Sequence, residues 1–408
     1  THTPVMSEQS VSWRSYALVV TGTLVYTSLM FSWFSLPAYL PTIIEEVGLS
    51  GTEAGILAGA VPLTYIPLAL FSGLAVDRIG PGRSLVVALA CIGTAQIARS
   101  TAPGFPALLA TTIALGVGAT LVTFGLPKLV SVLFPPDATG FPSSIYLVGA
   151  STGTAAAFSL GRPLLGPALG GWRQLFFWTG VVVLGYAVVW LVVVWSSRLG
   201  KDTTASTETT EQPPMLGDLK TVLLHRELRL VVVLGITYLL IIHGLQGWLP
   251  TILESRGLSA GRAGQTTTML VGANVVGILT VPGLADRLDA RRTAIVGASA
   301  VAGLGVAGII GGGLTPLVVA GIVGAGLGVG GLSPMVRAIP PALEGIGTRL
   351  TGTAVGLVFA IGELGGFAGP FLIGLFRDAT GSFVPGLSIL AVSGIAAVLA
   401  GSRLETVG

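Results

Sequence analysis

The chain has 408 residues, of which 52 % are hydrophobic and only 10 % are charged, against about 25 % charged residues in a typical soluble domain. This composition excludes a soluble globular protein and predicts a polytopic membrane protein. Its apolar runs are continuous and about 20 residues long, as membrane-spanning helices require, whereas a transmembrane β-barrel would show alternating segments of about 10 residues. The net charge of +3 gives no reason to expect nucleic acid as a partner.

Twelve apolar spans are expected along the chain. Six lie in the first half, near residues 15–39, 53–76, 84–101, 106–130, 141–168 and 174–196, and six in the second half, near residues 229–250, 262–284, 293–313, 315–337, 350–374 and 383–401. The long polar stretch between them predicts a linker. We therefore expect an all-α membrane protein with an N-terminal six-helix half (1–196), a cytoplasmic linker (197–227) and a C-terminal six-helix half (228–408).

The two halves share an internal repeat. Residues 40–50 return as residues 249–259 with eight of eleven positions identical, and Asp77-Arg78 maps onto Asp286-Arg287 at the same offset of 209 residues. A constant offset over about 40 residues predicts two copies of one unit. An even number of spans in each copy makes the copies parallel repeats, related by an axis along the membrane normal.

The Lys and Arg residues predict the orientation in the membrane. If the N-terminus is inside, fifteen of them, including Arg78 and Arg337, face the cytoplasm. Five would face the outside: Arg99, Arg173, Arg256, Arg262 and Arg377. Because positive charge is retained on the cytoplasmic side, we expect a multi-pass protein of the cell (inner) membrane with both termini in the cytoplasm.

Two predicted cytoplasmic loops carry a repeated charge motif, at residues 73–83 between spans 2 and 3 and at residues 283–292 between spans 8 and 9. Here the chain resembles the major facilitator superfamily, whose loop 2–3 signature is G-x-x-x-D-R-x-G-R/K-R/K. The resemblance implies the twelve-helix major facilitator fold and a conformational latch in these loops, formed by Gly73, Asp77, Arg78, Arg83, Asp286 and Arg287. Plain anchoring of positive charge at the lipid headgroups is the alternative.

Other segments resemble particular branches of that superfamily. Residues 126–130 (LPKLV) and 248–253 (WLPTIL) are similar to the cyanate-porter-like and anion-transporting branches. Residues 166–173, with Gly166-Pro167 followed by Gly170-Gly171, are similar to a G-P-x-x-G-G motif that is common in proton-coupled antiporters and is also compatible with helix packing in symporters.

Two charges lie within predicted spans, where topology does not explain them. Arg162 is in span 5 and Glu363 is in span 11, and a charge at such depth costs at least about 2.5–3.5 kcal/mol. Three interpretations are open. Arg162 binds an anionic substrate while Glu363 carries the coupling proton, or the two form a structural salt bridge between the halves, or each faces a wet cavity without being essential.

Several polar and aromatic side chains are further candidates. Histidine as a residue type titrates near physiological pH, so His243 in span 7 could relay a proton with Glu363. The predicted substrate contacts, besides Arg162, are Gln246, Asn274, Tyr26 and Tyr65. Lys128 and Arg337 end spans 4 and 10, where they are snorkelling anchors by default or parts of an inner gate.

These features predict a secondary active transporter that works by alternating access, with proton-coupled symport (uptake) of a small organic or inorganic anion. The alternative is a proton-coupled efflux antiporter for drugs or metabolites. Two features would favour it: a cavity lined by aromatic and aliphatic groups, and an Arg162 whose charge is neutralised by another protein group. A minor alternative is a membrane sensor that does not transport.

No nucleotide-binding loop, nucleophile constellation or metal-ligand cluster is present in the sequence, and Cys91 is its single cysteine. We therefore expect no enzymatic activity, no metal and no cofactor, with the proton gradient as the energy source. The expected partners are a small anionic molecule and the lipid bilayer, and the protein is expected to be a monomer.

Overall fold

The structure is a computed structural model that describes residues 13–135, 138–197, 222, 224–343 and 346–405. The predicted linker at 197–227 lies almost wholly outside the described residues. In the first half the helices are α1 (Trp13–Val47), α2 (Gly51–Ile79), α3 (Pro81–Ser100), α4 (Phe105–Leu133), α5 (Gly140–Ala156), the π-helix η2 (Ala157–Leu165), α6 (Gly166–Leu169) and α7 (Trp172–Ser196). In the second half they are α9 (Arg226–Ser255), α10 (Ala260–Arg287), α11 (Arg291–Gly311), α12 (Pro316–Ala338), the short 3₁₀-helix η3 (Pro340–Ala342), α13 (Gly347–Thr380) and α14 (Val384–Ser402).

The predicted helical membrane fold is confirmed. Within the described residues, eleven helices are long and apolar enough to cross a membrane. The remaining predicted span, near residues 141–168, is formed by α5, η2 and α6 in succession. It is broken into three pieces because the backbone changes from α-helical to π-helical hydrogen bonding at Ala157. Wider π-helical turns inside an α-helix are frequent at functional sites.

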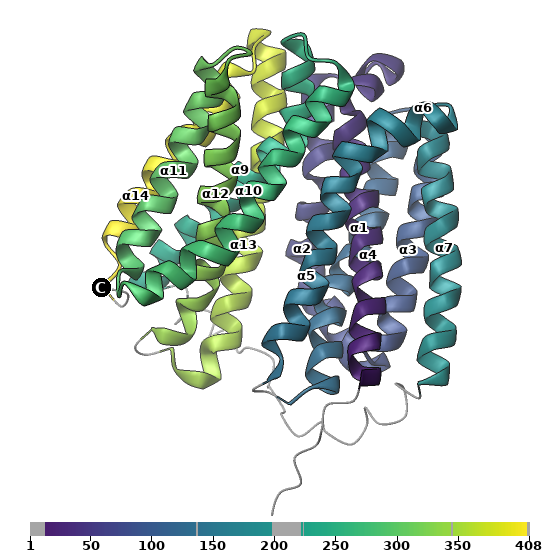
Figure 1. The fold of residues 1–408 in the computed structure, drawn as a ribbon, viewed down its shortest axis with the longest axis horizontal. Coiled ribbons are helices and arrows are strands. Elements are labelled where there is room, and N and C mark those ends of the chain that lie inside the picture. Colours follow the sequence, from purple (N-terminus) through teal and green to yellow (C-terminus); the bar gives the residue numbers. More distant parts are fainter. Residues whose placement is uncertain (1–12, 136–137, 198–221, 223, 344–345, 406–408) are drawn as a thin grey trace, which may run out of the picture.

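The helices form two bundles that stand side by side, one from each half of the chain (Figure 1). Across the boundary between the halves, α2 packs on α13, while η2 and α5 pack on α10. We call the end of the molecule that holds Trp13 and Ser402 the terminus end, and the end that holds Ser50 and Ser259 the far end. The terminus end is the one predicted to face the cytoplasm.

The repeated sequence at residues 40–50 and 249–259 forms the same turn at the far end of each half. Gly48 and Gly257 have positive φ angles of 73° and 98°, a conformation that glycine adopts at no steric cost. Ser50 then caps α2, accepting a hydrogen bond from the amide of Glu53 at 3.1 Å while the Glu53 carboxylate accepts one from the amide of Ser50 at 2.9 Å. This capping box fixes where α2 begins.

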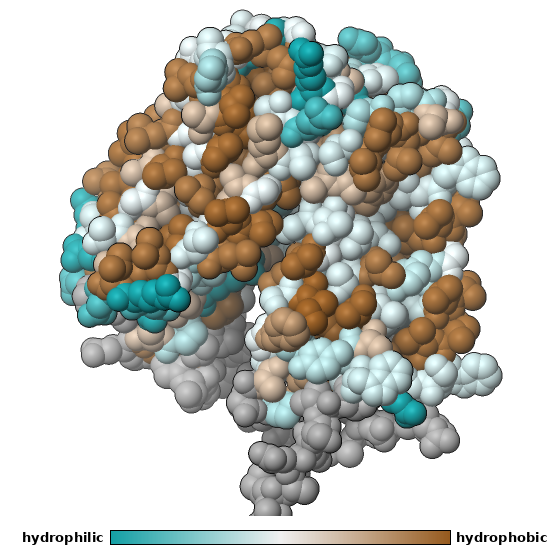
Figure 2. Space-filling model, viewed as in Figure 1, coloured by the Kyte–Doolittle hydropathy of each residue, from teal (hydrophilic) through white to brown (hydrophobic). Residues whose placement is uncertain are grey.

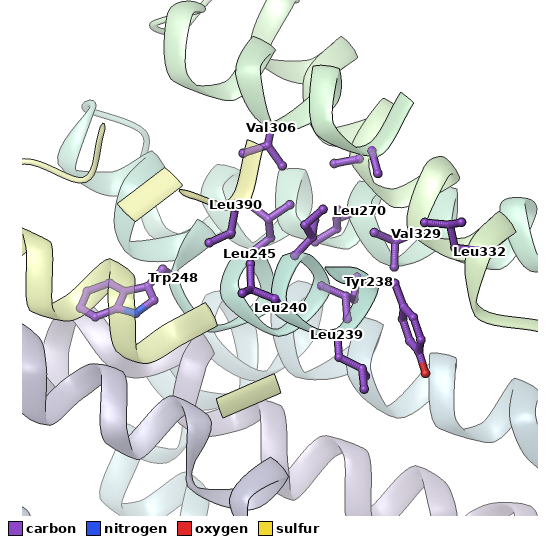
Figure 3. Close-up of a cluster of buried hydrophobic side chains, with 14 of the residues drawn as sticks. Tyr238, Leu239, Leu240, Leu245, Trp248, Leu270, Val306, Val329, Leu332 and Leu390 are labelled. Atoms are coloured by element: carbon purple, nitrogen blue, oxygen red, sulfur yellow. The ribbon is translucent and has the colours of Figure 1, made fainter. Parts of the chain in front are cut away.

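The apolar core of the second half is built around α9. Figure 3 shows Leu240, Leu245 and Trp248 of this helix packed among side chains of α10, α11, α12 and α14. Tyr238 lies at one edge of the cluster, and its hydroxyl points away from it (Figure 3). The same helix therefore presents an apolar face to the core of its own half, while the Tyr238 hydroxyl points out of that core.

Large apolar side chains also cover much of the outer surface (Figure 2). On α7, Val182, Val188 and Trp195 are 68 %, 62 % and 85 % exposed. In water such a surface would be costly, since each buried CH₂ group gains about 0.8 kcal/mol. It matches the hydrocarbon core of a bilayer, as expected for a multi-pass membrane protein.

Candidate functional site

The two halves are joined by an ion pair near the far end. Arg162, in the last turn of η2, pairs with both carboxylate oxygens of Glu254 in α9. Its guanidinium also donates to the carbonyl of Ala38 at 2.9 Å and to the hydroxyl of Thr42 at 3.3 Å, both in α1. The Arg162 and Glu254 side chains are only 10 % and 18 % exposed. This ion pair therefore bonds the second half to the first away from bulk water.

The π-helix and the glycines after it position Arg162. The ring of Tyr39 lies 5.6 Å from the guanidinium carbon. Gly166 has no room for a Cβ atom because the Tyr39 hydroxyl occupies that space. Gly170 and Gly171 then have φ angles of 97° and 121°, which lets the chain reverse from α6 into α7. The G-P-x-x-G-G segment thus serves a close helix contact and a sharp turn.

A second contact joins the halves at the far end. The carboxylate of Asp378, near the end of α13, accepts hydrogen bonds from the amides of Gly51 and Thr52 at 2.6 and 2.7 Å, and from the Thr52 hydroxyl at 2.6 Å. These amides are the unsatisfied donors at the start of α2. A carboxylate there also interacts favourably with the helix dipole, so α13 of one half caps a helix of the other.

In the part of the chain that the structure describes, the two aspartates of the predicted latch pair within their own halves and do not connect the halves. At the terminus end, Asp77 pairs with Lys128 of its own half at 2.9 Å, and Asp286 pairs with Arg291 of its own half at 2.7 Å. The other latch residues at this end are Gly73, Arg78, Arg83 and Arg287, of which the three arginines are exposed. In the space-filling view a notch separates the halves at this end (Figure 2).

Glu363 and His243 lie together, as the sequence-based hypothesis requires. A Cβ atom built on Gly366 would be 2.8 Å from Oε2 of Glu363 and 3.2 Å from Cδ2 of His243, so the two side-chain atoms are within 6.0 Å, the sum of those distances. His243 also stacks on Trp33 of the other half, with 5.5 Å between ring centroids. Glu363 is 4 % exposed, and its Oε2 has no hydrogen-bond partner in the described part of the chain.

Aromatic residues of both halves surround Arg337 between the bundles. The guanidinium carbon of Arg337 is 5.9 Å from the ring centroid of Phe359, which in turn forms an edge contact with Tyr65 at 5.9 Å. Arg337 also interacts with the hydroxyl of Tyr238 and electrostatically with Tyr26 and Glu363. The predicted contacts Tyr26 and Tyr65 are therefore in one site with the predicted proton carrier.

The remaining predicted contacts are Asn274, Gln246 and Arg162. The Asn274 amide donates to the carbonyl of Gly326 at 3.5 Å, so it packs α10 against α12 within the second half. Gln246 is buried in α9. Arg162 and Glu363 form no ion pair with each other, because Arg162 is paired with Glu254.

Two basic residues at the far end, the end predicted to face the outside, are packed into the protein. Arg99 is fully buried and donates to the carbonyl of Ser32, to Gln96 and to Thr112 at 3.1–3.2 Å. Arg256, directly after α9, donates to the carbonyl of Ile309 at 2.7 Å, and burial lowers its pKa. Both residues hold helices together at the far end. Counting Lys and Arg on each side of the membrane does not reveal such a role.

Sequence reasoning also missed Glu254, Asp378, Tyr146 and Tyr238 as site residues. A signal for Glu254 exists, because it is the counterpart of Glu45 in the internal repeat, and Glu45 also interacts electrostatically with Arg162. Arg337 was predicted only as an anchor or gate at the end of a span. No sequence pattern placed it beside tyrosines from the other half of the chain.

A twelve-helix membrane fold in two halves, with charged and aromatic side chains gathered between them, defines a small-molecule transporter of the two-bundle type. The chain matches the family model of the Major Facilitator Superfamily over residues 22–370. It therefore belongs to that superfamily, as the loop motifs implied.

Similar proteins include transporters of organic acids. The chain is 27 % identical over 357 residues to the 3-(3-hydroxy-phenyl)propionate transporter of Escherichia coli, covering 86 % of this chain and 84 % of that protein. It is 25 % identical over 375 residues to a putative tartrate transporter of Agrobacterium vitis, covering 86 % and 84 %. The solved inward-facing structure of a bacterial homolog of the human lysosomal transporter Spinster has the same fold, with a TM-score of 0.77, 17 % identity and 96 % coverage of both chains.

Proposed function

We propose that this protein is a secondary active transporter that takes up a small organic anion together with protons by alternating access. The observation that carries the proposal is the arrangement of Glu363, His243 and Arg337 in one site between the halves. A carboxyl group and an imidazole with few contacts to water can bind and release protons, and a nearby guanidinium can hold an anion. The organic-acid transporters among the relatives support an anionic substrate.

The alternating-access step rests on the different contacts at the two ends. At the far end Arg162 with Glu254 and Asp378 with Thr52 cross between the halves, while the ion pairs of Asp77 and Asp286 at the terminus end stay within one half. This asymmetry supports a state that is closed at the far end. In the opposite state the far-end contacts would break, and Arg162 would become free to meet an anion, which is one of the three interpretations that its sequence position leaves open.

A proton-coupled exporter of drugs or metabolites is the second candidate. The observation that favours it is that Arg162 is paired with Glu254 while aromatic residues line the space around Arg337. The two candidates differ in the charge of the substrate. An exporter of neutral or cationic compounds has no use for Arg337 as an anion contact, whereas an anion importer requires it.

The test is uptake of radiolabelled organic acids into proteoliposomes with an imposed pH gradient. Uptake should rise when the outside is acidic and should lose this dependence in Glu363→Gln. The matched control is Glu405→Gln, which removes an exposed carboxylate whose ion pair with Arg226 lies at the terminus end and should leave uptake unchanged. Unaltered pH dependence in Glu363→Gln would show that Glu363 does not carry the proton.

A further inference from the structure

Among the described residues, Arg337 has no carboxylate ion-pair partner in the central site. It lies in the last turn of α12, and its side chain is exposed to solvent although protein groups surround it. None of the four ion pairs among the described residues includes it. Glu363 is a carboxylate that interacts electrostatically with Arg337, but the two groups form no ion pair. A guanidinium in this position is available to a ligand.

Phenol groups from three further helices interact with Arg337. Tyr238 of α9 interacts with Arg337 through its hydroxyl. Tyr26 of α1 and Tyr146 of α5 lie with their ring centroids 6.1 Å apart, and both interact electrostatically with Arg337. Hydroxyl donors beside a guanidinium are suited to a carboxylate, because both of its oxygens can then be hydrogen-bonded.

Aromatic faces lie next to these polar groups. Phe359 is in contact with Arg337 on one side and with the ring of Tyr65 on the other, and the Tyr65 hydroxyl is bonded to Thr123 at 2.8 Å. That bond holds the Tyr65 ring in place. Rigid aromatic side chains favour a flat apolar body through offset or edge contacts worth about 0.5–1.5 kcal/mol each beyond burial.

We propose that this site selects a monocarboxylate with an aromatic ring. The carboxylate binds Arg337 and the Tyr238 hydroxyl, and the ring packs on the partly exposed face of Phe359, which the buried Tyr65 supports from behind. In the state seen here a dicarboxylate is rejected because its second charge would have no cation: among the described residues Lys128 is paired with Asp77 and Arg162 with Glu254, and Glu363 would repel it. A buried charge without a partner is costly, so this rejection contributes directly to specificity.

This inference rests on the proposed function and names its substrate class. The test measures binding to the purified full-length protein by thermal shift, with phenylacetate as the probe. Phenylacetamide, which lacks the charge, and succinate, which carries two, are the comparison probes. Phenylacetate alone should raise the melting temperature, because a ligand that binds only the native state stabilises it.

The variants then locate the site. Arg337→Gln should weaken phenylacetate binding at least tenfold, and Arg337→Lys, which keeps the charge but not the planar fork, should recover only part of the loss. Arg226→Gln, at an exposed ion pair with Glu405, is the matched control and should bind normally. Phe359→Leu should weaken phenylacetate several-fold while leaving the binding of isobutyrate, which has no ring, unchanged.

Different failures have different meanings. Equal shifts with phenylacetamide, or normal phenylacetate binding in a folded Arg337→Gln, would overturn the assignment of Arg337 as the carboxylate contact. Binding and pH-driven uptake of succinate instead of phenylacetate would overturn the substrate class and leave the proposed anion uptake intact. Binding restricted to neutral or cationic compounds would overturn both.

Discussion

The ion pair of Arg162 and Glu254 offers a direct test of how the far end is closed. We expect Glu254→Gln to increase the fraction of molecules that are open at this end. Removing one partner of a fully buried ion pair costs about 3–5 kcal/mol, and an exposed pair is worth about 0.2–1 kcal/mol. The exposures of 10 % and 18 % lie near the buried limit. Because glutamine can still accept a hydrogen bond, we expect a loss of about 2–3 kcal/mol.

This energy converts into a change of population. If the pair exists only in the far-end-closed state, its loss shifts the equilibrium between the two states by the whole amount. At 1.4 kcal/mol for each factor of ten, about 2–3 kcal/mol corresponds to a shift of about 30- to 150-fold.

Labelling of a buried cysteine measures that shift. Ala38 is 2 % exposed and its carbonyl accepts a hydrogen bond from Arg162, so a cysteine there is covered while the pair is intact. In a Cys91→Ser background, Ala38→Cys should react slowly with a membrane-impermeant maleimide added from outside and much faster when Glu254→Gln is added. The exposed substitution Glu405→Gln should leave the rate unchanged.

The double substitution Arg162→Gln with Glu254→Gln separates two contributions: the attraction between the paired charges, and the cost of leaving one buried charge without its partner. It removes both charges, so no charge is left without its partner, and the increase in labelling should be smaller than the product of the two single effects. A rate for Glu254→Gln within twofold of the parent, or single effects that simply multiply, would refute the argument that this pair closes the far end.

Three further substitutions test other contacts. Gly374→Ala should also open the far end, because its Cβ would collide with the Gly51 carbonyl; unchanged labelling of Ala38→Cys would contradict this. Asp378→Asn should increase that labelling about fivefold, since losing a helix cap costs about 1 kcal/mol, and a smaller rate than the parent would rule out a closing role. Arg99→Met should lower the melting temperature by several degrees, because it leaves buried acceptors unpaired at about 1–3 kcal/mol each; an equal or higher melting temperature would show that Arg99 does not tie these helices together.

The sequence was sufficient for the architecture because that architecture depends on patterns that are local or repeated. Continuous apolar runs marked the spans, and the repeat at 40–50 and 249–259 marked the two halves. The π-helix at Ala157–Leu165 was not predicted. Pro163 lies inside it and lacks a backbone N–H, but a proline in an apolar span indicates a local disturbance and not which hydrogen-bonding pattern replaces the α-helix.

The site was predicted only in part because its residues come from distant segments. Glu363 and His243 were found since a charge or imidazole within an apolar run is visible in the sequence. The partner of Arg162 was not predicted, because Glu254 belongs to the repeated segment, and a residue that recurs in both halves does not stand out as part of a site. The equivalence of Glu254 to Glu45 shows that a repeated residue can still take a different role in each half.

The contact between α2 and α13 has a consequence for how the protein changes state. A Cβ atom on Gly55 would lie 2.6 Å from the carbonyl oxygen of Pro370, and one on Gly59 would lie 2.8 Å from that of Phe367. The two backbones therefore touch along successive turns. Dispersion forces decay steeply, and a gap of 0.5–1 Å already forfeits about a quarter to a half of the attraction. A partly separated interface would keep little of its energy, so intermediates should be sparsely populated. Distance measurements on single molecules should show two narrow populations and not a continuous distribution.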